Sequence, residues 1–210
     1  MGTADGGVTA NRGTQAAPDR ARDVIDVLIE DHRRVMDLVA ALRDRRPAEP
    51  ERRRDLVDVV VAELVRHAAA EEQYLYPAVR RHLPDGDALA ERGLAEHAAA
   101  EPVMRDLLDT FAEDERFDRL VEALADALAR HVRIEEGDLF PPLRAALDEA
   151  ALLDLGTAVL SAKKLAPTRP HPAGPHHPPF NKVTAPVLGL VDHAIDSLTD
   201  RPTTVDELFD

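Results

Sequence analysis

The sequence contains no cysteine and no tryptophan, and only 2 tyrosines and 5 phenylalanines among its 210 residues. Without cysteine the chain cannot form a disulfide scaffold, an iron–sulfur cluster, a thiolate zinc site or a cysteine nucleophile. No stretch approaches the roughly 18 uninterrupted apolar residues that a membrane span needs. The N-terminal residues also lack the apolar segment of a signal peptide. The chain is nevertheless 44% hydrophobic, which is enough for a substantial core.

Positive charge is scarce as well. The chain has 26 Lys and Arg against 40 Asp and Glu, which gives a formal net charge of −14. Non-specific binding to nucleic acid or to an anionic membrane needs clustered cations, so this balance argues against both partners. These features predict a soluble, cytoplasmic, acidic protein that binds neither nucleic acid nor membrane.

Helical spacing of apolar residues organises most of the chain. Residues 1–18 are aperiodic and rich in Gly, Thr and Ala, so we expect them to be disordered. Over residues 19–148, apolar positions recur in steps of three and four in four long stretches, which predicts an antiparallel up-down-up-down four-helix bundle. We further expect an additional helix over 149–165, an extended Pro/His-rich connector over 166–186, and a C-terminal helix and tail over 187–210. No alternating strand pattern competes, so the fold class is all-α.

Each of the four long helices carries a histidine in the middle of its apolar stripe, and in three of them a glutamate follows four residues later. Residues four apart share one helix face, so each pair points into the core. Burial of unpaired carboxylates is strongly unfavourable, which leaves a dense hydrogen-bonded network or bound cations as the two ways to hold these side chains. Metal ions would satisfy all of them at once. The candidate metal ligands are His32, His67, Glu71, His97, Glu101, His131 and Glu135.

These positions form an internal repeat. The pattern H-x-x-x-E-E-x-x-L-[YF]-P occurs at residues 67–77 and again at 131–141, at an offset of 64, and the lone histidines His32 and His97 repeat at an offset of 65. The chain therefore consists of two αα-hairpins, each contributing a His and then an H-x-x-x-E. Packed with pseudo-two-fold symmetry, they would place equivalent ligand sets around one centre, which suits two metal ions better than one.

The ligand types narrow the choice of metal. Imidazole and carboxylate without sulfur fit iron, manganese or zinc and disfavour Cu(I). The Glu-x-x-His pairs of ferritin-like di-iron bundles are absent, because Ile or Leu stands three residues before each of these histidines. No H-E-x-x-H occurs, which excludes a zincin protease.

The ordered pattern H…HxxxE…H…HxxxE resembles the hemerythrin-like HHE cation-binding domain over about residues 20–148, and the Pro/His-rich tail is similar to that of actinobacterial members. The resemblance implies a four-helix bundle that holds two non-haem iron ions with an oxo or hydroxo bridge. It implies that His32 and His67 bind one iron, that His97 and His131 bind the other, and that Glu71 and Glu135 bridge them. The implied partners are O2, NO or peroxide, and the protein would be a monomer or a homodimer.

The sequence departs from the oxygen-carrying hemerythrins at two points. They have a second histidine four residues after that of the third helix, where this chain has Glu101; an anionic ligand there would favour ferric iron over reversible O2 carriage. Their His-x4-Asp pattern would place the last carboxylate at Glu136, whereas the helical stripe favours Glu135, because Glu136 is rotated by roughly 100°. Tyr74 and Tyr76 could donate a hydrogen bond to a ligand, bind iron, or simply pack.

Three functions fit these patterns. The first is a di-iron protein that binds, senses or detoxifies O2, NO or peroxide, with catalase-like disproportionation or NO/peroxide reduction as its enzymatic form. The second is an iron-binding or iron-sensing module without turnover. The third is a helical interaction domain that metal or a His/Glu network merely stabilises.

Overall fold

The computed structural model describes residues 22–45, 49–171 and 180–208, and within these ranges it contains helices and no strand. The predicted all-α class is therefore confirmed. The expected disorder of residues 1–18 lies outside the described residues. The elements are α1 (Val24–Arg43), α2 (Pro50–Ala70), η1 (Glu71–Leu75), α3 (Tyr76–His82), α4 (Gly86–Asp109), α5 (Glu115–Ile134), η2 (Glu135–Leu139), α6 (Phe140–Ala146), α7 (Glu149–Leu165), α8 (Phe180–Leu198) and η3 (Asp206–Leu208).

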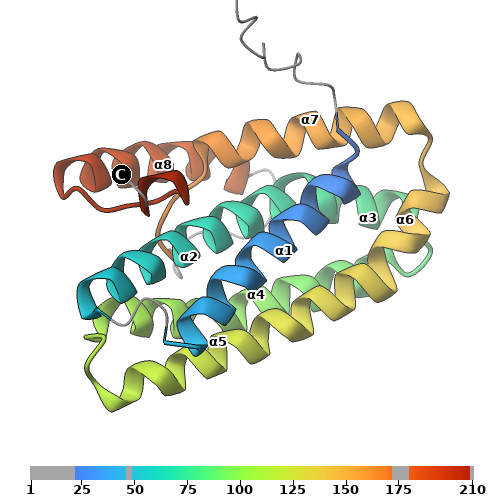
Figure 1. Ribbon diagram of the computed structural model, residues 1–210. Coiled ribbons are helices and arrows are strands. Elements are labelled where there is room, and N and C mark those ends of the chain that lie inside the picture. The colour runs from blue at the N-terminus through green and yellow to red at the C-terminus, as the bar shows by residue number, and fades with distance from the viewer. Residues whose placement is uncertain (1–21, 46–48, 172–179, 209–210) are drawn as a thin grey trace, which may run out of the picture.

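Four long helical rods form the bundle (Figure 1). The first is α1, the second is α2 continued by η1 and α3, the third is α4, and the fourth is α5 continued by η2 and α6. The helix α1 packs against α2 and α5, and α4 packs against α2, α3 and α5, which closes the bundle. Short connections join consecutive rods, so neighbouring helices run antiparallel as the sequence predicts.

Aspartates define several helix starts. Asp23 accepts a hydrogen bond from the backbone N–H of Ile25 at the start of α1, and Asp114 and Asp148 cap α5 and α7 in the same way. The helix α2 begins instead at Pro50, whose missing N–H is harmless in the first turn of a helix. The caps at Asp23 and Asp114 thus help to fix where the first and fourth rods begin, and with them the positions of His32 and His131 along the bundle.

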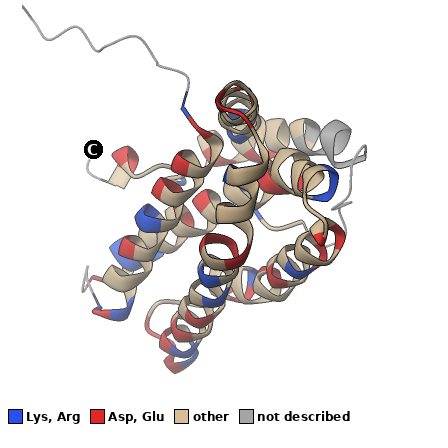
Figure 2. Cartoon of the chain, turned by 90° about the vertical axis from the view of Figure 1, so that its right-hand side faces the viewer, with Lys and Arg blue, Asp and Glu red and all other residues tan. Residues whose placement is uncertain are grey.

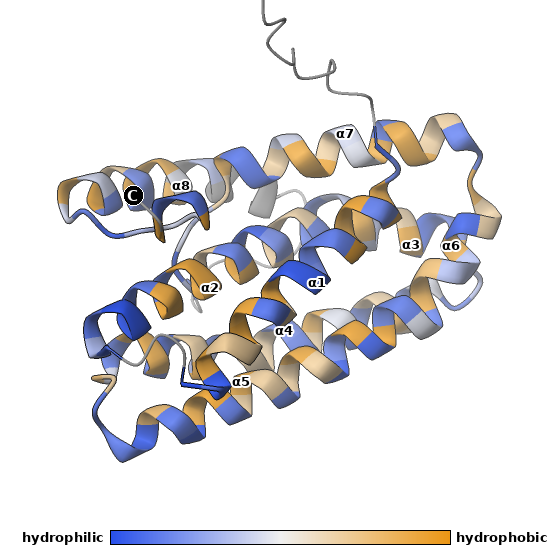
Figure 3. Cartoon of the chain, in the orientation of Figure 1, coloured by the Kyte–Doolittle hydropathy of each residue, from blue (hydrophilic) through white to orange (hydrophobic). Residues whose placement is uncertain are grey.

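The apolar core is divided into two clusters at opposite ends of the bundle. One contains Leu28, Leu75 and Leu139, and the other contains Val35 and Leu124 together with many other buried aliphatic side chains. Hydrophobic residues line the inward faces of the rods (Figure 3), whereas charged residues lie mainly on their outer faces (Figure 2). The four histidines fall between the two clusters along the chain, so a polar layer separates the two halves of the core.

Two further helices lie beside the bundle. The helix α7 packs on α1 and α2, and α8 continues the same layer in contact with α7 (Figure 1). The C-terminal helix begins at Phe180, earlier than the expected start at residue 187, and contains Pro186. Of the connector expected over 166–186, residues 166–171 are non-helical, 172–179 lie outside the described residues, and 180–186 belong to α8 instead. None of the described helices is both long enough and apolar enough to cross a membrane.

Gly156 allows α7 to approach the start of α1. A Cβ at this position would lie only 2.0 Å from the backbone oxygen of Arg22. We expect Gly156→Ala to lower the free energy of unfolding by about 1–3 kcal/mol, because the backbone has to move. Thermal unfolding followed by circular dichroism measures the loss.

Gly137 provides the matched control for this substitution. No atom lies within 4 Å of a Cβ built there, so Gly137→Ala should leave the unfolding midpoint unchanged or slightly raised. An equal loss in both variants would contradict the proposed close approach of α7.

Candidate metal centre

Five buried side chains converge between the rods. Each offers one nitrogen or oxygen atom, and these five atoms all lie within 4.8 Å of one another. Both repeats contribute, since the residues come from α1, from α2 and η1, and from α5 and η2. The group consists of His32, His67, Glu71, His131 and Glu135.

A π-helical turn shapes each H-x-x-x-E-E motif. Glu71–Leu75 and Glu135–Leu139 are π-helical, and the backbone N–H groups of Tyr76 and Phe140 donate to the oxygens five residues earlier, those of Glu71 and Glu135. The next residue in each motif is a proline, which has no N–H with which to resume the α-helical pattern there. Such turns are frequent at functional sites, and here each one begins at a glutamate of the cluster. The sequence predicts an uninterrupted α-helix at both places. The proline repeated at the end of each motif is the feature that indicates the π-helical turn.

The inner atoms of the cluster lack hydrogen-bond partners among the described residues. They include Nε2 of His32, His67 and His131, both carboxylate oxygens of Glu71, and Oε2 of Glu135. His67 Nε2 lies 2.9 Å from Glu71 Oε1, but the two are not aligned for a hydrogen bond. Buried polar atoms without partners are costly. Atoms that converge on a common centre in this way fit a bound cation, and the nitrogen and oxygen donors fit iron, manganese or zinc.

A second layer of carboxylates holds the outer nitrogens of the histidines. Glu136 lies 2.9 Å from Nδ1 of His32, and Glu72 lies 3.0 Å from Nδ1 of His97. Glu72 and Glu136 are equivalent in the repeat. Contacts of this kind fix the ring so that Nδ1 carries the proton and Nε2 faces the metal.

A third outer contact links α7 to the centre. Asp31 Oδ2 lies 3.5 Å from His67 Nδ1, and Asp31 Oδ1 lies 2.6 Å from Lys163 Nζ. Sequence reasoning missed Asp31, Glu72 and Lys163 as parts of the site. The repeated E-E doublet and the acid that precedes each lone histidine were the available signals for the two carboxylates.

The structure separates the two alternatives for the last carboxylate. Glu135 is fully buried inside the cluster, while Glu136 lies outside it against His32. Among the described residues, Glu135 is therefore placed to reach a metal ion and Glu136 to orient a ligand.

The remaining two candidate ligands, His97 and Glu101, do not belong to the five-residue cluster. His97 is buried, and its Nε2 is 3.2 Å from Glu71 Oε2, so it borders the cluster without belonging to the five-atom group. Glu101 lies outside the group, on the wall of an adjacent cavity with Leu64 and Met104. Because α4 runs antiparallel to α2, the step from His97 to Glu101 leads away from Glu71, which explains why the H-x-x-x-E spacing has a different outcome on this helix.

Tyr76 and Phe140 are equivalent in the repeat, and they make the two sides of the centre different. The Tyr76 hydroxyl donates to Glu135 Oε1 at 2.9 Å and lies 3.2 Å from His97 Nε2. Phe140 instead stacks on the His32 ring, with centroids 5.7 Å apart. Gly93 makes room for the phenol, since a Cβ there would lie 2.3 Å from the Tyr76 oxygen. Tyr74, by contrast, is partly buried against the apolar core.

Comparison with known proteins identifies the family. Residues 23–143, more than half of the chain, match the hemerythrin HHE cation binding domain. The chain belongs to this family. An uncharacterized hemerythrin-like protein of Schizosaccharomyces pombe is 28% identical over 178 residues, which cover 84% of this chain and 85% of that protein. A DNA nickase of Nostoc sp. is 27% identical over 157 residues, which are 75% of this chain and 44% of that relative's length.

A solved structure shares the fold. The crystal structure of a hemerythrin HHE cation binding domain-containing protein from Mycobacterium kansasii has a TM-score of 0.59 and 24% identity to this chain. The match covers 68% of this chain and 86% of that one. The family, together with the His/Glu cluster, establishes a metal-binding hemerythrin-like bundle.

Protons on two histidines of the centre compete with a metal ion for the same nitrogen atoms. Burial lowers the pKa of His67, but Glu71 and Asp31 outweigh it and raise the pKa to about 10. Glu71 and Glu72 likewise overcome burial and raise the pKa of His97 to about 10. Burial lowers the pKa of His131 to about 3; Glu135 opposes this and the other histidines reinforce it. Without metal, His67 and His97 therefore hold protons that a metal ion must displace.

This competition predicts opposite pH trends for the metal-free and the metal-loaded protein. A raised histidine pKa stabilises the folded state fully below about pH 6.5, and the stabilisation is lost as pH rises toward about 10. We expect the midpoint of thermal unfolding of the metal-free hemerythrin-like protein to fall between about pH 6.5 and 9. Over the same range the increase in midpoint caused by zinc, a redox-inert probe, should grow. A zinc effect that shrinks with rising pH would contradict the assignment.

The outer carboxylates should set metal affinity. We expect Glu72→Gln and Glu136→Gln to weaken zinc binding by about 10–100-fold, because each histidine loses the carboxylate that orients it. Competition with a chromophoric chelator measures the affinity. Glu122→Gln is the matched control, since Glu122 is half exposed and pairs with Arg43. Unchanged affinity in the first two variants would refute their orienting role.

Proposed function

We propose that this protein binds two iron ions at the cluster and disproportionates hydrogen peroxide to water and O2. The observation that carries the proposal is the convergence on one centre of buried His and Glu atoms from both repeats that have no hydrogen-bond partner among the described residues. The two oxygens of Glu71 face different helices, one at 2.9 Å from His67 and the other at 3.2 Å from His97. This arrangement supports Glu71 as a bridge between two metal positions, and the repeat makes Glu135 its counterpart.

The outer carboxylates favour redox chemistry at iron over reversible O2 carriage. His32, His67 and His97 each have a carboxylate within 3.5 Å of Nδ1, which makes their Nε2 atoms more basic. Basic, anion-rich ligand sets stabilise the ferric state, whereas O2 carriage needs a persistent diferrous site. Glu101 was expected to favour ferric iron as an anionic ligand, but it lies outside the cluster and does not contribute to this effect.

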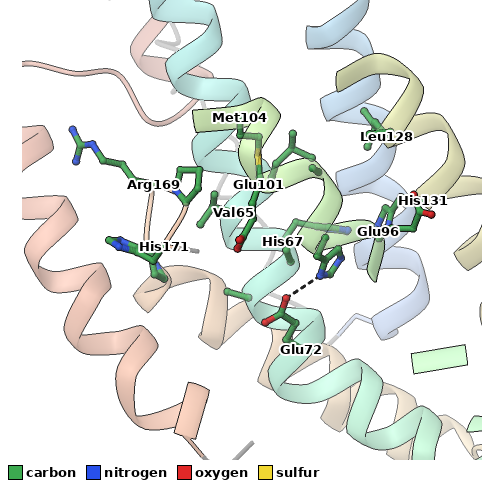
Figure 4. Close-up of a pocket in the computed structure, with 18 of the residues that line it drawn as sticks. Val65, His67, Glu72, Glu96, Glu101, Met104, Leu128, His131, Arg169 and His171 are labelled. Atoms are coloured by element: carbon green, nitrogen blue, oxygen red, sulfur yellow. Dashed lines mark hydrogen bonds and ion pairs between the residues drawn. The ribbon is translucent and has the colours of Figure 1, made fainter. Parts of the chain in front are cut away.

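The protein supplies access and a fixed hydrogen-bond donor. Iron, when bound, supplies the two electrons that peroxide reduction consumes and peroxide oxidation returns. Burial, followed by the charges of Glu135 and Glu71, raises the pKa of Tyr76 well above its usual value, so Tyr76 keeps the proton on its hydroxyl oxygen. The cavity bordered by His67, His97 and His131 provides a route to the centre (Figure 4).

The likeness to a DNA nickase gives little support to a role in DNA cleavage for this protein. Less than half of that relative is covered by the match. The net charge of −14 also opposes binding to the phosphate backbone of DNA.

The proposal is tested by metal content and by O2 evolution on the full chain. Protein expressed with iron should contain about two iron ions per chain, the number that a bridged dinuclear site holds. We expect it to release O2 from hydrogen peroxide, as followed with an oxygen electrode. His67→Ala and His131→Ala should lose most of both the iron and the activity, because each removes a buried donor atom of the cluster.

His82→Ala serves as the control, because His82 is exposed on α3 and should leave iron and activity unchanged. Two irons per chain without O2 evolution would overturn peroxide disproportionation and favour an iron-binding module. No bound iron, with folding indifferent to chelators, would favour a structural His/Glu network.

A further inference from the structure

A cavity of about 110 Å³ lies directly beside the metal centre. Its inner wall contains His67, His97 and His131, three of the histidines of the centre. Most of the remaining wall is aliphatic, from α2, α4 and α5: Leu64, Val65, Ala68, Ala100, Met104, Leu124 and Leu128. The cavity therefore combines a metal-facing end with an apolar body.

The cavity is larger than a diatomic ligand or hydrogen peroxide needs. About 10–15 Å³ of such volume holds one water molecule, and an apolar cavity of about 150 Å³ in another protein holds benzene. The cavity beside this centre therefore has room for an organic group of about four carbons. Among the described residues its walls contain no Phe, Tyr or Trp, which suits a compact aliphatic group.

The charges around the cavity select an uncharged ligand. Glu72 and Glu101 lie on the walls formed by the bundle and disfavour an anion such as a carboxylate. Arg169 and His171 lie at the opposite side (Figure 4), where Arg169 pairs with Asp196 at 2.7 Å and His171 with Asp192 at 3.0 Å, so neither adds an uncompensated positive charge. The aliphatic body of the cavity disfavours a charged group of either sign, which favours a ligand with a neutral polar head and an aliphatic tail.

The outer wall comes from the segment beyond the family domain, which ends at residue 143. Pro167, Pro170 and Leu188 contribute to it. Asp192 of α8 holds this segment by accepting hydrogen bonds from the backbone N–H groups of Thr168, at 3.0 Å, and Arg169, at 3.2 Å. The common domain thus carries the metal ligands, and the C-terminal segment sets the size of the cavity.

We infer that the cavity binds the alkyl group of a short-chain aliphatic hydroperoxide, ROOH, whose peroxide group reaches the metal centre. This inference rests on the proposed function, since it names a second peroxide substrate for the same centre. With iron held by the cluster as the source of two electrons, the O–O bond of ROOH would break and two protons would be taken up, which would yield ROH and water. Oxidation of hydrogen peroxide to O2 returns the two electrons and two protons.

The inference is tested with tert-butyl hydroperoxide and hydrogen peroxide on the diferrous protein in stopped-flow measurements. Ala100→Phe fills the cavity from α4. It should lower the rate constant for tert-butyl hydroperoxide by about tenfold or more, because each buried carbon contributes a factor of about four. The rate constant for hydrogen peroxide should change by less than about twofold, since its small volume leaves it a path. Ala98→Phe is the matched control, because Ala98 is exposed on the same helix.

Binding without turnover gives an independent readout. The fluorine NMR signal of 1,1,1-trifluoro-2-methyl-2-propanol, an inert analogue of the alcohol product, should shift and broaden with the wild-type holoprotein and with Ala98→Phe, but not with Ala100→Phe. The fluorine signal of the analogue with the wild-type holoprotein decides whether the cavity binds it, even if Ala100→Phe does not fold.

The outcomes separate the two proposals. One outcome overturns the inference and leaves the proposed function standing. In it, hydrogen peroxide oxidises the diferrous protein, but the fluorine signal does not shift and tert-butyl hydroperoxide reacts no faster with the protein than with free ferrous ions. Failure of both peroxides overturns both, even if the fluorinated alcohol binds.

Discussion

The structure depends on a polar layer buried in the middle of an apolar bundle. Two clusters of mainly aliphatic side chains fill the ends of the bundle, and between them lie four imidazoles and several carboxylates. Among the described residues, the inner nitrogens of His32, His67 and His131 and three carboxylate oxygens of Glu71 and Glu135 have no hydrogen-bond partner. Such a layer opposes folding unless something compensates for it. In the metal-free state protons on His67 and His97 do so in part, and a metal ion can do so more completely. Metal binding and stability are therefore coupled in this fold.

The internal repeat explains two of the outer carboxylate contacts around the centre but not the third. His32 and His97 each meet the second glutamate of an E-E doublet, Glu136 and Glu72, as the repeat requires. The symmetry fails at Asp31. Asp31 contacts His67, but its counterpart Glu96 contacts Arg130 instead, at 3.4 Å.

The partner of Glu96 in the symmetric arrangement would be His131, whose Nδ1 has no hydrogen-bond partner in the described part of the chain. Lys163 and Tyr76 further distinguish the two sides, because Lys163 holds Asp31 and Tyr76 has Phe140 as its counterpart. The two sides of the centre therefore have different surroundings even though their candidate ligands belong to one repeated motif.

The sequence predicted the features that follow from periodicity. Apolar spacing located the rods, and the interruption of each stripe by histidine located the polar layer. The π-turns were missed, because helical periodicity over ten residues does not reveal one widened turn. The same limit affected Glu101, whose spacing from His97 matches the two motifs although the direction of α4 carries it out of the cluster. Contacts such as Asp31 with Lys163 join residues more than a hundred positions apart, and no local pattern encodes them.

The C-terminal segment changes what the common domain can do. The domain match ends at residue 143, yet α7 supplies Lys163 to the outer layer of the centre and residues 167–171 close the adjacent cavity. Without residues 167–171 the His/Glu cluster would be unchanged, but the apolar cavity beside it would be more open to solvent. A centre open to water discriminates ligands only by their affinity for metal, whereas an enclosed apolar cavity also selects them by size and polarity. Under the proposed function, selectivity would therefore depend on the segment outside the family domain and reactivity on the repeat inside it.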